Sequence, residues 1–93
     1  MKESEKALEK KLASEVKKLG GWSIKLVCTF VAGLPDRLGL HSGKAYSCEM
    51  KSDGKKPSPI QRVIHKKLQA VGFTVYVIDN TEKLNGFLRN LEI

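Results

Sequence analysis

The fold of this chain is decided by residues 33–51, which read GLPDRLGLHSGKAYSCEMK. Residues 45–51 alternate between apolar and polar side chains, which is the pattern of a strand with one buried face. Glu49 and Lys51 lie two positions apart on this strand and therefore project from the same face. The turn at residues 41–44 joins the strand to a shorter one before it, so the segment predicts a β-hairpin.

Around this hairpin, hydrophobic periodicity predicts three helices and two further strands. The helices are expected at residues 4–19, 59–71 and 81–91, and the strands at residues 22–30 and 73–78. Gly20 and Gly21 end the first helix, while Ser58 and Pro59 start the second. The second helix is long enough to cross between parallel strands. The sequence thus predicts an α/β fold with the order α-β-β-β-α-β-α and a mixed sheet flanked by helices.

Several side chains can be assigned to the core or to the surface. The second helix carries one apolar stripe, formed by Ile60, Val63, Ile64, Leu68 and Val71. We expect Trp22 and Tyr46 in the core rather than as stacking platforms for bases. His65 lies on the polar face of its helix and is expected at the surface rather than as a catalytic base. Cys28 and Cys48 have no metal-ligand spacing, which predicts buried free thiols and no zinc site.

Length and composition limit the class of protein. A chain of 93 residues forms one domain, which we take to span residues 1–93. The net charge of +7 attracts polyanions, of which nucleic acid is the commonest. No apolar run approaches the ~20 residues needed to cross a bilayer, and the N-terminus lacks a basic-then-apolar signal. We therefore expect an intracellular protein without a membrane partner.

Charged side chains of the hairpin form a candidate site. Asp36 follows Pro35 at the start of the shorter strand and can turn towards the edge that carries Glu49 and Lys51. Two carboxylates and a main-chain carbonyl, such as that of Met50, suit Mg²⁺ or Mn²⁺. Such an ion can activate water and neutralise charge during phosphodiester hydrolysis. The Lys51 ammonium can orient the water or stabilise developing negative charge.

The order and spacing of these motifs resemble the PD-(D/E)xK nucleases, and in particular their VRR-NUC branch, the virus-type replication-repair nuclease domain. The similar segments are residues 19–21, 33–38, 49–51, 58–61 and 72–77. The resemblance implies a restriction-endonuclease-like core and divalent-metal-dependent DNA cleavage without an organic cofactor. For stand-alone members of minimal size it implies homodimers that act on branched DNA, such as four-way (Holliday) junctions. A phage- or virus-encoded protein that acts inside a host cell fits this resemblance.

The resemblance also implies a metal-site acid on the first helix. Counting back from Gly20 and Gly21, the matching position is Glu9. Helical periodicity instead favours Glu5, which lies nearer the centre of the apolar stripe. Following the resemblance, we assign the metal-site acid to Glu9, and Glu5 stays open as the alternative.

Some candidate residues have equally simple structural roles. Asp36 after Pro35 can be a turn residue, and Gln61 can close a capping box with Ser58. In the family, the residue matching Gln61 lies near the active site. Five basic residues are candidates for DNA contacts, although each can also be a solvated surface charge: Lys25, Arg37, Lys55, Lys56 and Arg62. A non-catalytic basic module that binds nucleic acid is the alternative function.

Overall fold

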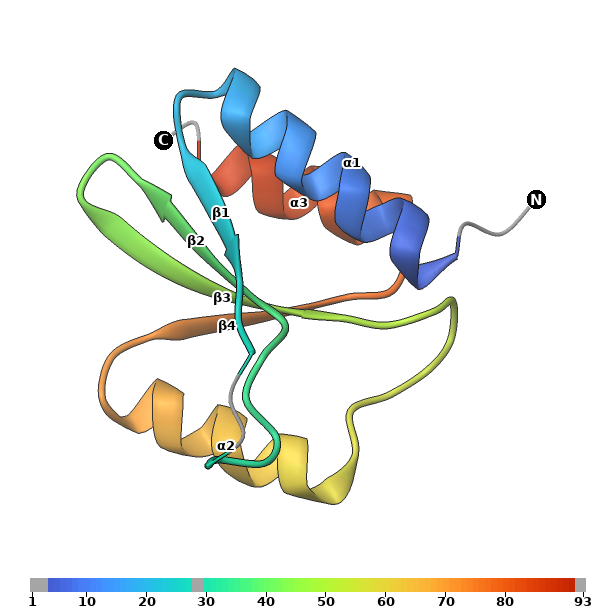
Figure 1. The fold of residues 1–93 in the computed structure, drawn as a ribbon, viewed down its shortest axis with the longest axis vertical. Helices are drawn as coiled ribbons and strands as arrows, with labels where there is room; N and C mark the ends of the chain where they lie inside the picture. Colours follow the sequence, from blue (N-terminus) through green and yellow to red (C-terminus); the bar gives the residue numbers. More distant parts are fainter. Residues whose placement is uncertain (1–3, 28–29, 92–93) are drawn as a thin grey trace.

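In the computed structural model, which describes residues 4–27 and 30–91, three helices surround a four-stranded sheet (Figure 1). The elements are α1 (Glu5–Lys18), β1 (Trp22–Lys25), β2 (Arg37–His41), β3 (Lys44–Met50), α2 (Pro59–Ala70), β4 (Thr74–Ile78) and α3 (Thr81–Leu91). The predicted order α-β-β-β-α-β-α is confirmed. Within these described ranges, no helix is long and apolar enough to cross a membrane.

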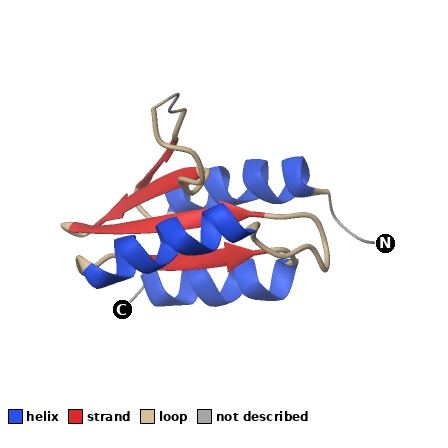
Figure 2. Ribbon diagram, turned by 90° about the horizontal axis from the view of Figure 1, so that it is seen from below, coloured by secondary structure: helices blue, strands red, loops and turns tan. Residues whose placement is uncertain are grey.

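The sheet is mixed and has the strand order β1-β2-β3-β4. β1, β2 and β3 pair antiparallel, whereas β3 and β4 pair parallel. α2 makes the crossover between the two parallel strands, as its length predicts. Helices α1 and α3 cover one face of the sheet, and α2 lies against the other (Figures 1 and 2).

The apolar core lies between the sheet and the layer of α1 and α3. Its buried members are Leu8, Leu12, Val16, Cys48, Met50, Ile78, Leu84, Phe87 and Leu91. On the helices these residues recur at intervals of three or four, which brings them to one stripe. Tyr46 packs beside them and meets the Phe87 ring at a centroid distance of 6.1 Å. Cys48 is a buried free thiol, as predicted, while Cys28 lies outside the described residues.

The first strand is shorter than predicted and its tryptophan is not in the core. β1 ends at Lys25, and the chain then leaves the sheet, where the Leu26 N–H donates to the Asp36 carbonyl at 2.8 Å. Trp22 is 65 % exposed, so its assignment to the core was wrong. The reason is that β1 is an edge strand, while α2 packs against β4 at the opposite edge. Among the described helices, only α2 lies on the side of the sheet opposite α1 and α3, and β1 at the far edge stays uncovered there.

The rotation of α2 about its axis also differs from the prediction. Ile60, Val63 and Val71 of the apolar stripe are exposed, whereas His65, which we had assigned to the surface, is buried. The physical reason lies across the interface, where the His65 ring is hydrogen-bonded to the buried carboxyl group of Glu49. A buried carboxyl group without a partner is costly, so this pairing outweighs the burial of Val63.

Candidate active site

Asp36 is held at the point where the hairpin strands begin to pair. Its Oδ2 accepts a hydrogen bond of 2.6 Å from the Met50 N–H. The register pairs Arg37 with Cys48, which places Asp36 opposite Glu49, one position further along. The loop before Asp36 packs closely on α2, since a Cβ at Gly33 would lie 2.9 Å from the Ile60 carbonyl oxygen. The backbone therefore fixes the direction of the Asp36 carboxylate.

Glu49 supplies the second carboxyl group of the candidate site and is 1 % exposed. Its pKa is raised from 4.5 to about 8. Burial is the main cause, followed by the hydrogen bond with Asp36 and the negative charge of Asp36, while the Lys51 ammonium acts in the opposite direction. Asp36 and Glu49 thus form a close carboxyl pair, as the hairpin geometry predicts, and the pair resists carrying two negative charges.

His65 joins this pair from α2 and was missed by the sequence analysis. Its Nε2 lies 3.2 Å from Oε1 of Glu49. Burial, and then the positive charge of Lys51, lower the pKa of His65. A signal was present in the sequence, because Gln61 and His65 are four residues apart and so lie on the same side of α2.

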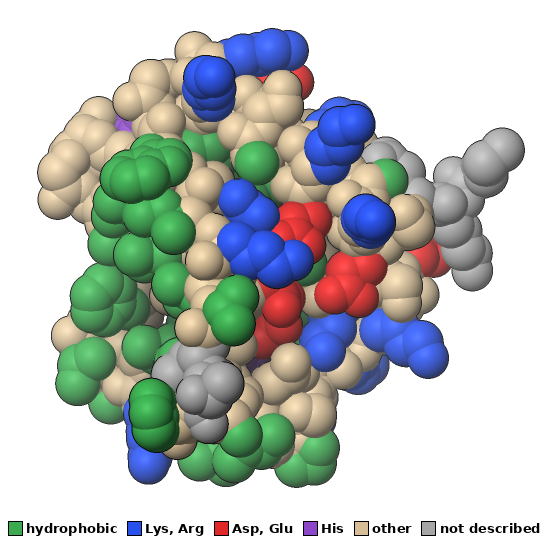
Figure 3. All heavy atoms as spheres, in the orientation of Figure 1, with side chains coloured by type: hydrophobic (Ala, Val, Ile, Leu, Met, Phe, Trp, Pro, Cys, Tyr) green, Lys and Arg blue, Asp and Glu red, His purple; other side chains and the backbone are tan. Residues whose placement is uncertain are grey.

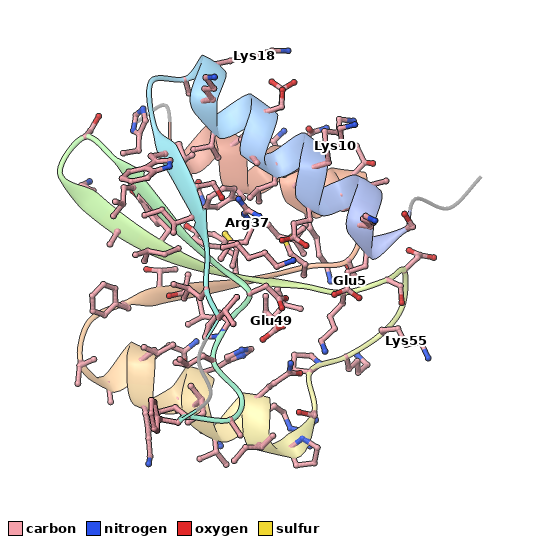
Figure 4. All side chains as sticks on the ribbon, in the orientation of Figure 1. Glu5, Lys10, Lys18, Arg37, Glu49 and Lys55 are labelled. Atoms are coloured by element: carbon pink, nitrogen blue, oxygen red, sulfur yellow. The ribbon has the colours of Figure 1, made fainter. Side chains whose placement is uncertain are left out.

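The two candidate acids of α1, Glu5 and Glu9, have different surroundings. Oε2 of Glu9 lies 2.8 Å from Arg37 Nη1 and 3.4 Å from Lys25 Nζ, so this carboxylate already has two cationic partners. Glu5, one helical turn earlier, adds to the repulsion that raises the pKa of Glu49. Figure 4 labels Glu5 on the first turn of α1, Glu49 on β3 and Arg37 on β2. Of these two acids, Glu5 is therefore the one whose charge raises the pKa of Glu49.

Two known proteins are similar to this chain, one in sequence and one in structure. The chain is 43 % identical over 79 residues to "Putative nuclease p44" of Acyrthosiphon pisum secondary endosymbiont phage 1, a match that covers 84 % of this chain and 85 % of that protein. A solved structure described as "VRR_NUC domain" is similar with a TM-score of 0.84 and 24 % sequence identity, covering 94 % of this chain and 97 % of the other. No family model matches the sequence.

The chain belongs to the VRR-NUC family. The α-β-β-β-α-β-α order and mixed sheet are the VRR-NUC fold. In this VRR-NUC chain the carboxyl pair lies on the face of the sheet that α2 partly covers. Figure 3 shows acidic side chains gathered near the centre of this view, with basic side chains around them.

Four other predicted site residues, in α2 and in the connection before it, differ in their contacts and exposure. Gln61 closes the capping box, since its Oε1 accepts from the Ser58 N–H at 2.8 Å. Arg62 donates to the Pro57 carbonyl at 3.0 Å and remains exposed. Lys55 and Lys56 are exposed in the connection from β3 to α2. Each of these three cations is therefore available to an anion.

Arg37 is oriented into the protein rather than towards solvent, with its side chain only 13 % exposed. Its Nε donates to Ser23 Oγ at 2.7 Å, and its Nη2 donates to the Ser23 carbonyl at 3.0 Å. Together with the Glu9 contact, these bonds fix the guanidinium at the junction of α1, β1 and β2. Arg37 therefore contributes a positive charge at a fixed position, and its side chain is not free to reach out towards a ligand.

The oxygen donors of the site fit a divalent metal ion. Among the residues that the structure describes, no three His, Cys, Asp or Glu side chains are already arranged around a common point. The Asp36–Glu49 pair nevertheless places two hard oxygen donors side by side, and their mutual repulsion is the kind that a divalent cation relieves. The residues present therefore suit Mg²⁺ or Mn²⁺ better than a softer metal.

Proposed function

We propose that this VRR-NUC chain is a divalent-metal-dependent endonuclease that hydrolyses DNA phosphodiester bonds. The observation that carries the proposal is the carboxyl pair, in which Asp36 is fixed by the Met50 N–H and Glu49 is buried with a pKa of about 8. The phage relative, which is described as a nuclease, and the net charge of +7 support the same substrate class.

In this proposal Asp36, Glu49 and the Met50 carbonyl hold Mg²⁺ or Mn²⁺, which activates water and neutralises the phosphate when bound. The Lys51 ammonium, which acts electrostatically on both Glu49 and His65, stabilises the charge that develops on the phosphate oxygens. His65 restricts the rotation of the Glu49 carboxyl group through its hydrogen bond. The side-chain amide of Gln61 retains its N–H donors for a phosphate or a water, because the cap uses only the amide oxygen.

We assign the α1 acid of the site to Glu5 rather than to Glu9. Glu9 has its carboxylate between Arg37 and Lys25, whereas the negative charge of Glu5 acts on Glu49. Glu5→Gln should therefore weaken Mn²⁺ binding and cleavage, while Glu9→Gln should act mainly on stability, since it removes the partner of a largely buried arginine. Titration of both variants with Mn²⁺, followed by cleavage and thermal unfolding, tests this. Loss of Mn²⁺ binding in Glu9→Gln alone would restore Glu9 to the metal site.

The proposal includes a homodimer that acts on branched DNA. Large apolar side chains are exposed on β1, in the loop that follows it and on α2: Trp22, then Val27 and Phe30, and then Ile60 and Val63. Figure 3 shows hydrophobic side chains gathered along one side of the molecule. Exposed apolar surface of this kind favours a protein interface, and a two-fold dimer supplies two opposed cutting sites for a symmetric junction.

Cleavage of matched linear, flap and four-way DNA by the wild type and by Asp36→Asn tests the proposal. With Mn²⁺ or Mg²⁺ present, the wild type should cut and should prefer branched DNA. Asp36→Asn should abolish cutting but retain DNA binding, because one charge of the metal site is lost while the basic surface is unchanged. Cleavage by Asp36→Asn at the wild-type rate would contradict the assigned site. Binding without cleavage by the wild type at every metal concentration would favour a non-catalytic module.

A further inference from the structure

A second concave site lies beside the carboxyl pair and has no part in the chemistry proposed above. It is a pocket of about 290 Å³ between α1 and the adjoining strands. Its lining consists of Lys6, Glu9, Lys10, Ala13, Lys25 and Arg37. Four cationic side chains therefore surround one carboxylate, which leaves the pocket strongly positive.

The floor of the pocket is rigid. Arg37 makes three hydrogen bonds, to Ser23 Oγ, the Ser23 carbonyl and Glu9 Oε2. Its side chain and that of Glu9 are only 13 % and 16 % exposed. An anion that enters the pocket thus meets a positive group that is already ordered, which lowers the entropy cost of binding.

Most of the positive charge at the rim of the pocket is not balanced by ion pairs among the residues that the structure describes. Lys6 and Lys10 are exposed, lie one helical turn apart on α1, and make no ion pair with any residue in the described part of the chain. Like charges at this spacing destabilise a helix slightly. Lys25 contacts Glu9 at 3.4 Å but keeps 63 % of its side chain exposed. A negatively charged ligand would relieve the repulsion between these lysines.

We propose that this pocket binds a backbone phosphate of the DNA strand at a position that is not cut. The inference rests on the proposed DNA substrate but not on its cleavage. The pocket residue Arg37 directly follows Asp36 in the chain, so the pocket begins next to the carboxyl pair. A DNA strand at the carboxyl pair therefore passes close to the pocket.

Figure 4 shows the elements that carry these residues, with Lys10 and Glu5 on α1, Arg37 on β2 and Glu49 on β3. A phosphate in the pocket fixes the position of the strand, whereas the scissile phosphate lies at the carboxyl pair. Phosphate contacts of this kind set register without reading sequence. The pocket thus acts as a positioning site for a DNA backbone of any sequence.

The test compares two double variants of α1 in the cleavage-deficient Asp36→Asn protein. Lys6→Ala/Lys10→Ala removes two pocket lysines, and Lys11→Ala/Lys17→Ala removes two exposed lysines of the same helix that do not line the pocket. DNA affinity is measured for each protein over a range of salt concentrations. The pocket variant should bind roughly tenfold more weakly, with a salt slope smaller by about 1–2, while the control should keep the slope of Asp36→Asn.

Equal salt slopes for the pocket variant and the control would overturn the inference, and so would a failure of Asp36→Asn to bind DNA. A selective loss of slope would support the pocket even if the wild type did not cleave DNA, so failure of the proposed function is distinguishable. In the cleaving protein, Lys6→Ala/Lys10→Ala should raise KM with little change in kcat. A fall in kcat with unchanged KM would place these lysines at the reaction instead.

Discussion

The two faces of the sheet differ in composition and in use. The face under α1 and α3 carries Cys48 and Met50, buried among aliphatic and aromatic side chains. The opposite face carries Ser47 and Glu49 on the same strand, and only α2 lies against it. One strand therefore contributes alternate residues to a stabilising layer and to a candidate catalytic layer. Because of this division, we expect substitutions on one face to change mainly stability and substitutions on the other to change mainly activity.

The largest effect on stability is expected from a substitution on the face under α1 and α3. Phe87→Ala removes a ring that is 1 % exposed and that meets Tyr46 and Tyr76 edge to face. The loss of this burial should lower the free energy of unfolding by roughly 3–5 kcal/mol. Chemical denaturation measures the change, and cleavage per folded molecule at low temperature should remain near that of the wild type. A variant that is stable but inactive would contradict the division between the faces.

Substitutions of His65 test the role of the opposite face, which carries Glu49. His65→Ala removes the ring that holds Glu49, so cleavage should fall by roughly 10–100-fold, as for other residues that orient a metal ligand. His65→Gln keeps an N–H donor and should recover part of the activity. The concentration of Mn²⁺ at half-maximal activity should rise in His65→Ala and return towards the wild-type value in His65→Gln. Equal losses in both variants, without a change in metal requirement, would point to a purely structural role.

The raised pKa of Glu49 predicts a pH-dependent stability in metal-free protein. The folded state holds the Glu49 proton more tightly than the unfolded state, because its pKa is about 8 rather than 4.5. Ionisation therefore destabilises the fold, and the Glu49 contribution should decline as the pH rises from about 4.5 to about 8. The lowered pKa of His65 acts in the opposite direction, since protonation of its ring on the acid side destabilises the fold.

Melting temperatures in a chelating buffer, measured for the wild type and Glu49→Gln, isolate the Glu49 contribution. The wild type should lose stability relative to Glu49→Gln as the pH approaches 8, and Mn²⁺ should restore it. If the melting temperatures of the two proteins differed by the same amount at pH 5 and at pH 8, the Glu49 carboxyl group would not be held in its neutral form.

The smallest effect on stability is expected from Trp22. Trp22→Ser should change the free energy of unfolding of the monomer by less than about 0.5 kcal/mol, because the side chain is 65 % exposed. If this face joins two copies, the variant should shift from dimer to monomer in sedimentation experiments. Lys66→Ser, at an exposed position of α2, is the matched surface control. An unchanged dimer would exclude Trp22 from the contact.

Local patterns in the sequence predicted most of the fold and placed the candidate site on one hairpin. The alternation in residues 45–51 predicted the strand that carries Glu49, and the Pro35–Asp36 step indicated the second candidate carboxylate. These features depend on neighbours along the chain or across one hairpin. The close approach of Asp36 to Glu49 follows from the register of that hairpin.

The incorrect assignments depended on contacts between distant elements. Apolar periodicity placed Val63 inside, but α2 is turned so that His65 meets Glu49 across the sheet. The choice between Glu5 and Glu9 likewise depends on Arg37, whose side chain reaches α1 from β2. The spacing of apolar residues in a helix does not indicate which charged side chains of a distant strand will lie against that helix.

The hydrogen bond from the Met50 N–H to Asp36 has a consequence for the nascent protein. A slip of one residue between β2 and β3 would separate this donor from its acceptor and would also turn Glu49 to the apolar face. Correct strand pairing is thus a precondition for assembling the two acids. Under the proposed function, newly made or partly unfolded chains would be unable to cut DNA until the hairpin had closed in its proper alignment.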